Sequence, residues 1–245
     1  MHLTSIVIPS YNGLHLLGHC IAEIRRFTDR PFELIVADDG STDGTAEFCR
    51  RENIPFVSLP RNRGFPCAAN AGLKMASGDT VVLMNNDIIV SRRWLDNMLA
   101  CLYSAEDIGI VGPMANYASG SQHHPLGYAD LTGFHEMTRE ANRPDPGKWR
   151  TVQRLVGMCM VMKRELIDRV GLLDERYAPG HYEDDDLCYR ARLHGFRLMV
   201  AGDTYVHHHG SASFRQLPPE KLAAVIETNR QKFIEKFGAD PLMFV

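Results

Sequence analysis

Short apolar strand patterns alternate with helical patterns along the first half of the chain. The strand patterns are continuous runs of apolar and β-branched residues, which is typical of strands buried on both faces. We expect strands over residues 5–8, 32–37, 55–59, 80–84 and 108–111. We expect helices over residues 14–27, from about 43, over 68–75 and over 94–103. This alternation predicts an α/β fold in which helices flank a mostly parallel central sheet.

Polar residues follow four of these strands at the point where each strand ends. In parallel α/β sheets, ligands bind beyond the carboxyl ends of the strands. Four separate segments therefore bring polar side chains to one edge of the predicted sheet. The segments are Pro9-Ser10-Tyr11-Asn12, Asp38-Asp39, Arg61-Asn62 and Asn85-Asn86-Asp87.

The pattern changes near residue 116. Residues 116–150 are rich in Gly, Pro, His and Asn and have a poor helical signal, so we expect a binding loop or lid. Further on we expect strands over 154–162 and 196–200, and helices over 164–170, 187–194 and 218–237. No internal repeat or linker divides the chain, and we therefore expect a single domain over residues 1–245.

Composition excludes several classes of protein. A formal net charge of -3 argues against a nucleic-acid partner. No run approaches the ~20 apolar residues of a membrane span, and the N-terminus lacks a signal-peptide pattern. Six separated cysteines without a Cys-x-x-Cys pair argue against zinc and disulfides. We expect a cytoplasmic protein whose only membrane contact would be peripheral, at the inner face.

Four consecutive carboxylates, residues 183–186, form the most unusual segment of the chain. Their mutual repulsion raises at least one pKa unless a cation or ligand offsets it. We interpret the run as the start of a helix at a cleft, with Glu183 and Asp184 as candidate general bases. An acidic first turn stabilised by the helix dipole is the alternative interpretation. The other two carboxylates, Asp185 and Asp186, would supply the negative field that raises the proton affinity of the base. Alternatively, they would pair with Arg190 and Arg192 of the same helix.

Asp87 and His208 are candidate metal ligands. Asp87 is the only ionised residue of Asn85-Asn86-Asp87. Mg²⁺ and Mn²⁺ prefer oxygen ligands, and the oxygens of a diphosphate can complete such a site. Imidazole also ligates manganese. His208 lies in His207-His208-His209, where strand alternation places it on the opposite face from its neighbours. The alternative for Asp87 is an Asx-rich turn that caps the next helix, and the alternative for His208 is a surface histidine cluster.

Two further pairs are candidates for binding a nucleotide. Asp38 and Asp39 would accept hydrogen bonds from a nucleobase, although a capped turn explains them equally well. Arg61 and Asn62 would contact a diphosphate or a base, and a solvated loop is their alternative.

The chain resembles family 2 glycosyltransferases of the GT-A fold. The resemblance covers most of residues 4–213 and depends on an ordered set of motifs rather than on one of them. The motifs are Ser5-Ile6-Val7-Ile8-Pro9-Ser10-Tyr11-Asn12, Ala37-Asp38-Asp39-Gly40-Ser41-Thr42-Asp43-Gly44-Thr45, Arg61-Asn62-Arg63-Gly64, Ala69-Asn70-Ala71-Gly72, Leu83-Met84-Asn85-Asn86-Asp87, Gly171-Leu172-Leu173-Asp174-Glu175, Tyr182-Glu183-Asp184-Asp185-Asp186-Leu187 and His208-His209-Gly210-Ser211-Ala212-Ser213.

The resemblance implies transfer of a sugar from a nucleotide sugar with inversion. It assigns Asp184 as the base, with Glu183 beside it on the acceptor side. Asp87 occupies the metal-ligand position of the family's DXD motif, where Asn85 replaces the first acid, and His208 completes the site. The nucleotide would be held by Pro9, Tyr11, Asn12, Asp38, Asp39, Arg61, Asn62, Asn85 and Asn86.

The same resemblance implies a UDP-, dTDP- or GDP-sugar donor, a divalent Mn²⁺ or Mg²⁺ ion, and a glycan, lipid-linked glycan or glycoconjugate acceptor. Residues 1–113 would form the nucleotide-binding half, 114–215 the acceptor and catalytic half, and 216–245 a C-terminal helical segment. A metal-dependent nucleotidyltransferase is an alternative, but the first strand lacks the Gly-rich loop with Lys that this class uses. A non-catalytic nucleotide-sugar-binding module is another, and the Glu183-Asp184 pair argues against it.

Overall fold

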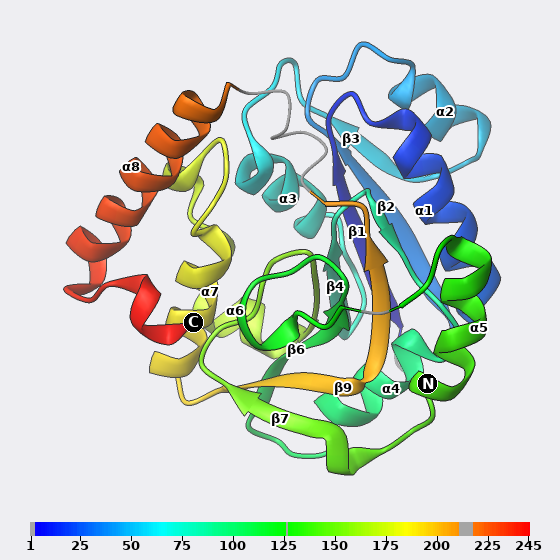
Figure 1. Ribbon diagram of the computed structural model, residues 1–245. Helices are drawn as coiled ribbons and strands as arrows, with labels where there is room; N and C mark the ends of the chain where they lie inside the picture. Colours follow the sequence, from blue (N-terminus) through cyan, green and yellow to red (C-terminus); the bar gives the residue numbers. More distant parts are fainter. Residues whose placement is uncertain (1–2, 126, 211–217) are drawn as a thin grey trace.

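A mixed sheet forms the centre of the computed structural model, which describes residues 3–125, 127–210 and 218–245 (Figure 1). In chain order its strands are β1 (Thr4–Ser10), β2 (Phe32–Asp38), β3 (Phe56–Ser58), β4 (Thr80–Met84), β5 (Ile88–Ile89), β6 (Ile108–Ala115), β7 (Trp149–Val152), β8 (Cys159–Lys163) and β9 (Arg197–His208). Their order in the sheet is β3-β2-β1-β4-β8-β6-β9-β5, and β7 pairs with β9 outside this path.

Helices cover both faces of this sheet. They are α1 (Leu14–Phe27), α2 (Thr45–Arg51), α3 (Phe65–Leu73), α4 (Trp94–Leu102), α5 (Leu131–Ala141), α6 (Arg164–Val170), α7 (Glu183–Leu193) and α8 (Pro219–Phe237). Short 3₁₀ turns are η1 (Gly120–Gln122), η2 (Pro146–Lys148), η3 (Glu175–Tyr177) and η5 (Pro241–Phe244). The α/β fold predicted from the sequence is confirmed.

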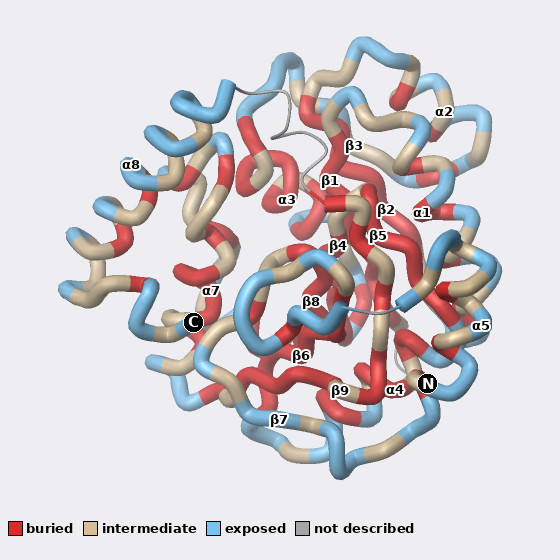
Figure 2. The backbone as a smooth tube through the Cα atoms, in the orientation of Figure 1, coloured by how far each residue is buried: buried red, intermediate tan, exposed pale blue. Residues whose placement is uncertain are grey.

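Alternating residues of the strands build two apolar clusters, one on each face. In β1, Ile6 and Ile8 belong to the cluster that includes residues of α1 and α4, whereas Val7 belongs to the cluster with residues of α3, α6 and α7. This alternation is why the strands read as continuous apolar runs. Figure 2 shows the buried strands enclosed by helices whose outer surfaces are exposed.

The parallel arrangement holds in two parts of the sheet. β1 pairs in parallel with β2 and β4, β2 pairs in parallel with β3, and β6 pairs in parallel with β9. Between these parts lies β8, which is antiparallel to both β4 and β6. The strand ends of β1, β2 and β4 therefore share one edge, as the sequence predicts.

The second half of the chain differs from the prediction in several elements. The strand expected over 154–162 is confirmed only from Cys159, where β8 begins, and residues 154–158 form an irregular segment along a cavity. The strand β7, which ends at Val152, was not predicted. Residues 116–150, whose helical signal is poor, nevertheless contain the helix α5. That helix is capped by Asp130, whose side chain accepts a hydrogen bond from the Gly133 amide, and it buries Phe134 and Thr138 four residues apart. β9 is also longer than predicted and reaches His208.

All six cysteines are unpaired and buried. Among the helices of the described ranges, none combines the length and the hydropathy that crossing a bilayer requires.

Candidate active site

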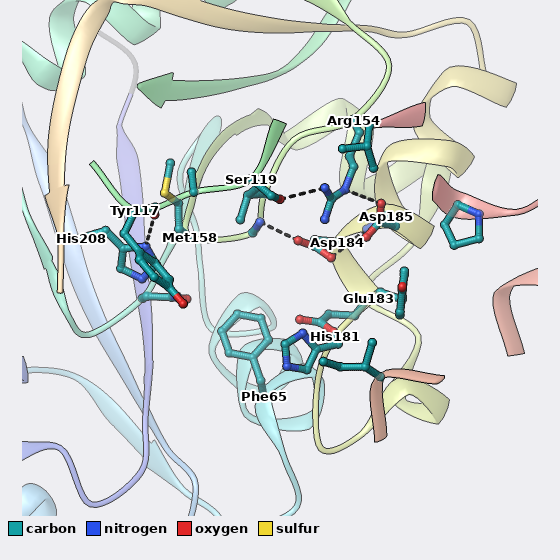
Figure 3. A pocket seen from close by; sticks show the side chains of 18 of the residues that line it. Phe65, Tyr117, Ser119, Arg154, Met158, His181, Glu183, Asp184, Asp185 and His208 are labelled. Carbon is teal, nitrogen blue, oxygen red and sulfur yellow. Dashed lines mark hydrogen bonds and ion pairs between the residues drawn. The ribbon is translucent and has the colours of Figure 1, made fainter. Parts of the chain in front are cut away.

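A cavity of about 500 Å³ lies between the ends of β4, β6 and β9 on one side and the start of α7 on the other (Figure 3). Asn85 and His208 line the first wall, and Glu183 and Asp184 line the second. Asp87 reaches the first wall through His208, since Asp87 Oδ1 lies 3.2 Å from His208 Nε2. The structure therefore brings His208 and the predicted base to one cavity, with Asp87 buried behind the wall in contact with His208.

The His208 imidazole is held so that its Nε2 atom faces Asp87. His208 Nδ1 lies 2.7 Å from the Tyr117 carbonyl oxygen and donates to it, which leaves Nε2 directed at the carboxylate. The Asn116 side chain fixes the backbone of His208, because its Oδ1 accepts from the His208 amide at 2.8 Å. These two contacts fix the position of the ring.

Asp87 Oδ1 and His208 Nε2 form a buried carboxylate–imidazole contact. Both side chains are buried, and within the described ranges neither atom has a hydrogen-bond partner. Buried polar atoms are normally satisfied, and a cation that both atoms bind would satisfy this pair. An oxygen and an imidazole nitrogen fit a divalent cation. The part of the chain that the structure describes contains no group of three or more His, Cys, Asp or Glu placed to hold an ion, so other ligands would complete the shell.

His207 lies on the other face of β9, and His209 directly follows the strand. His207 Nδ1 is 2.5 Å from the Tyr128 hydroxyl, and His207 Nε2 is 3.3 Å from His209 Nδ1. Burial alternates along the strand, with His208 buried and its two neighbours partly exposed. The predicted alternation is confirmed, and it selects His208 as the histidine that faces the cavity.

On the opposite wall, backbone amides fix the Asp184 carboxylate. Its Oδ2 accepts from the Gly157 amide at 2.8 Å, and its Oδ1 accepts from the Asp185 amide at 2.9 Å. Gly157 permits this approach, because a Cβ atom there would lie 3.1 Å from the Cβ of Asp184. The irregular segment that interrupts the expected strand thus provides a donor for the predicted base.

Glu183 is buried beside Asp184. Its Oε2 atom has no hydrogen-bond partner within the described residues. Burial raises the pKa of Glu183 well above its ordinary range, and the neighbouring Asp184 carboxylate raises it further. Figure 3 shows Glu183 and His181 on the side of the cavity where Phe65 lies.

Cations from other elements offset the remaining acidic charge. Arg154 Nε lies 2.5 Å from Asp185 Oδ1, and Arg154 Nη1 donates to the Ser119 hydroxyl at 2.9 Å. Burial and the Asp184 carboxylate raise the pKa of Asp185, and Arg154 opposes that rise. Sequence reasoning missed Arg154, because its ion pair with Asp185 joins residues 31 positions apart, with no local spacing to indicate it.

One of the two arginine pairings predicted for Asp186 is confirmed. Arg190, one helical turn later, pairs with Asp186 at 2.5 Å, and Lys236 of α8 also pairs with it. The expected pairing with Arg192 is wrong. Arg192 lies nearly two turns along α7, and its guanidinium stacks 4.8 Å from the Phe244 ring centroid.

The predicted nucleotide-binding residues of β1 and β2 lie at the shared strand edge but outside the 500 Å³ cavity. Asp38 accepts from the Ser41 amide at 2.9 Å and from the Ser58 hydroxyl at 2.8 Å. Asp39 accepts from the amides of Arg63 and Gly64, each at 2.8 Å. Both carboxylates therefore fix loops at this edge, whatever else they bind.

The other candidates at this edge differ in exposure. Pro9 is buried within β1, Tyr11 follows it and is half-buried, and the exposed Asn12 accepts from the Thr42 amide at 2.8 Å. Arg61 and Asn62 are exposed after β3. Asn86 connects the edge to the cavity wall, since its Nδ2 donates to the Ser10 hydroxyl at 2.9 Å. Ser211, Ala212 and Ser213, the last motif residues, lie outside the described residues.

Comparison with known proteins identifies the class. The family described as "Glycosyl transferase family 2" matches residues 5–171, and the chain belongs to this family. A solved structure of similar fold is mannosyltransferase PcManGT from Pyrobaculum calidifontis in complex with GDP-Man and Mn2+. That structure has a TM-score of 0.68 and 22% identity, with 96% of this chain and 64% of that chain covered.

Two curated relatives illustrate the range of proteins in which such a chain occurs. An N-acetylglucosaminyl-diphospho-decaprenol L-rhamnosyltransferase of Mycobacterium tuberculosis is 27% identical, with 89% of this chain and 80% of the relative covered. The uncharacterized protein y4gI of Sinorhizobium fredii is 29% identical over 90% of this chain, which spans 26% of that protein's length.

The buried Glu183 predicts a pH dependence of stability. The unfolded chain releases the Glu183 proton near the ordinary pKa of 4.5, whereas the folded protein retains it to higher pH. The stabilisation is therefore complete below 4.5 and is lost as pH rises toward the raised pKa. Relative to Glu183→Gln, the wild type loses up to about 1.4 kcal/mol of unfolding free energy per pH unit in that window.

Urea unfolding of both proteins between pH 4 and pH 8 measures this difference. Glu220→Gln, at an exposed position of α8, is the matched control, and its curve runs parallel to the wild type. Parallel curves for Glu183→Gln and the wild type would contradict the burial argument.

Proposed function

We propose that the chain is an inverting, metal-dependent glycosyltransferase that moves a sugar from a nucleoside-diphosphate sugar to an acceptor hydroxyl. Family membership supports the class of reaction. The observation that carries the site assignment is the shared cavity, in which His208, in contact with Asp87, lines one wall and Asp184 lines the opposite wall. A sugar held between them would have its leaving group on one side and the attacking hydroxyl on the other.

Asp87 Oδ1 and His208 Nε2 would hold the divalent cation, Mn²⁺ or Mg²⁺, and oxygens of the diphosphate and water would complete its shell. Bound there, the cation would neutralise charge on the departing nucleoside diphosphate. Asn85 stands where an acid would supply a second carboxylate, which leaves the protein with two ligands and makes ion binding depend on the nucleotide. PcManGT was solved with Mn2+.

Asp184 would act as the general base. The Gly157 and Asp185 amides hold its carboxylate in a fixed orientation at the cavity wall. The base removes the proton of the acceptor hydroxyl while the acceptor oxygen bonds to the anomeric carbon and the bond to the diphosphate oxygen breaks. Attack from the face opposite the leaving group inverts the anomeric configuration. Glu183 lies beside the base on the acceptor side.

The nucleotide would lie along the ends of β1, β2 and β3. In this proposal Tyr11, Asn12 and Asp39 contact the base and ribose. Hydrogen bonds to neighbouring loops already orient the carboxylates of Asp38 and Asp39, which supports the assignment. The remaining residues proposed for this edge are Pro9, Asp38, Arg61, Asn62, Asn85 and Asn86.

The acceptor would enter past the segment that follows β6. Tyr117, Ala118 and Ser119 line the cavity there, whereas α5 packs beside β9. Residues 117–119 are therefore the part of 116–150 that we propose as the acceptor wall. A glycan, a lipid-linked glycan or another glycoconjugate fits the family, and one relative's name describes a lipid-linked acceptor. We place the reaction in the cytoplasm, with peripheral membrane contact where the acceptor is lipid-linked.

A screen of nucleotide sugars for Mn²⁺-dependent release of nucleoside diphosphate tests the proposal. UDP-, dTDP- and GDP-sugars are each presented with a set of glycan acceptors, and both nucleoside diphosphate and pyrophosphate are measured. Release of nucleoside diphosphate with formation of a glycoside supports sugar transfer. Release of pyrophosphate would instead indicate nucleotidyl transfer, and no turnover with any donor would indicate a binding module.

Asp184→Asn removes the proposed base while keeping the size of the side chain. We expect transfer to fall about 10²- to 10⁴-fold, since this is the usual contribution of a positioned base. Thermal shifts caused by UDP, GDP or dTDP with Mn²⁺ stay unchanged, because the nucleotide is held elsewhere. Asp168→Asn, at an exposed position of α6, is the matched control. An unaffected transfer rate would remove Asp184 from the role of base.

Asp87→Asn tests the cation site without an activity assay. In Asp87→Asn we expect the enhancement of nucleoside-diphosphate binding by Mn²⁺, measured by calorimetry, to fall at least about tenfold. Loss of a residue that merely orients a metal ligand already costs this much in metal affinity. Asp29→Asn is the exposed control. Equal Mn²⁺ enhancement in variant and wild type would place the ion elsewhere.

A further inference from the structure

The segment that precedes the proposed base has an unusual backbone. Three consecutive residues between η3 and α7 have positive φ angles: Gly180 at 154°, His181 at 74° and Tyr182 at 72°. Positive φ is unfavourable for residues with a side chain, and neighbouring structure must supply the interactions that hold it. The next residue is Glu183, so this conformation determines how the first turn of α7 meets the cavity.

One buried side chain of α8 binds the backbone of this segment. Asn229 is 1% exposed, and its Nδ2 donates to the carbonyl oxygens of Tyr177 at 2.6 Å, Gly180 at 2.8 Å and His181 at 3.2 Å. The amide has two N–H groups, so one of them is shared between two carbonyls. Three carbonyls that converge on one donor fix the turn more tightly than a single hydrogen bond would.

Two lysines on the same face of α8 complete this contact. Lys232 Nζ donates to Asn229 Oδ1 at 2.8 Å, which orients the amide, and to the Arg176 carbonyl at 2.6 Å. Lys236 pairs with Asp174 Oδ2 at 2.8 Å and also with Asp186. Positions 229, 232 and 236 lie three and four residues apart and so share one helix face. Figure 1 shows α8 alongside the chain that leads into α7.

We propose that Asn229 is a positioning residue for the transfer reaction: it holds residues 177–182 in the conformation that presents Glu183 and Asp184 to the cavity. The inference builds on the proposed function. It concerns a helix beyond residues 5–171, the part that the family matches. Asn229 itself does not line the cavity and acts through the backbone of the segment.

The contacts of the segment predict a local effect when Asn229 is replaced. The Pro179 carbonyl still accepts from the Phe65 amide at 2.9 Å, and the aromatic packing of Phe233 and Phe237 against Tyr189 still attaches α8 to α7. The segment therefore loses its fixed turn while both ends stay anchored. Small displacements of catalytic groups reduce rates far more than they reduce binding.

The experiment compares Asn229→Ala and Asn229→Asp with Thr228→Ala, an exposed neighbour on α8. Hydrogen exchange of the protein without substrate measures the backbone amides of residues 177–186. Turnover uses the nucleotide sugar that the wild type accepts in the screen above, well below the unfolding temperature of each variant. Thermal shifts with UDP, GDP and dTDP plus Mn²⁺ report nucleotide binding.

We expect both Asn229 variants to exchange faster across 177–186 and to lose about 10- to 100-fold in kcat, with the KM for the donor nearly unchanged. Asn229→Asp is at least as impaired as Asn229→Ala, because a carboxylate repels the three carbonyls although it has the size of the amide. Thr228→Ala behaves as the wild type does.

Two results would overturn the inference. One is exchange across 177–186 that matches Thr228→Ala, and the other is a normal kcat in Asn229→Asp. A wild type that turns over no nucleotide sugar would count against the proposed function, and the exchange measurement would still decide whether Asn229 holds the segment.

Discussion

The buried contact between Asp87 Oδ1 and His208 Nε2, which lie 3.2 Å apart, is the constraint on which the account of this site depends. The other ring nitrogen of His208 donates to the Tyr117 carbonyl, so Nε2 is oriented toward the carboxylate. Neither atom has a hydrogen-bond partner among the described residues, and a divalent cation that both atoms bind would satisfy them. The ends of β4 and β9 keep both residues in place, so the fold preserves the arrangement in the absence of an ion.

The opposite wall of the cavity contains a concentration of negative charge. Four consecutive carboxylates begin α7, and each has a different environment. Asp185 pairs with Arg154, Asp186 pairs with Arg190 and Lys236, and backbone amides bind Asp184. Glu183 is buried and its Oε2 atom has no partner among the described residues, and its raised pKa follows from burial. Two of the four carboxylates, Asp185 and Asp186, are thus stabilised by cationic side chains, and Asp184 is stabilised by backbone amides that leave it at the cavity wall.

Local patterns in the sequence predict the first half of the fold well. The predicted bounds of α1 and β4, residues 14–27 and 80–84, match the structure because their apolar periodicity is complete within the element. Residues 154–158 and helix α5 were predicted wrongly, since long-range contacts determine the first and a short buried face supports the second. Asp87, His208 and Asp184 are proposed as site residues from motifs and strand alternation. Arg154 and Asn229 are not, because each contacts its partners across about thirty to fifty positions of the chain.

A crystal structure with Mn²⁺ and a nucleoside diphosphate, with the metal located by its anomalous scattering, tests the central claim most directly. The account predicts one strong peak bonded to Asp87 Oδ1, His208 Nε2 and diphosphate oxygens, on the wall of the cavity that Asp184 faces. A peak at another place, or a diphosphate bound away from that cavity, would contradict it.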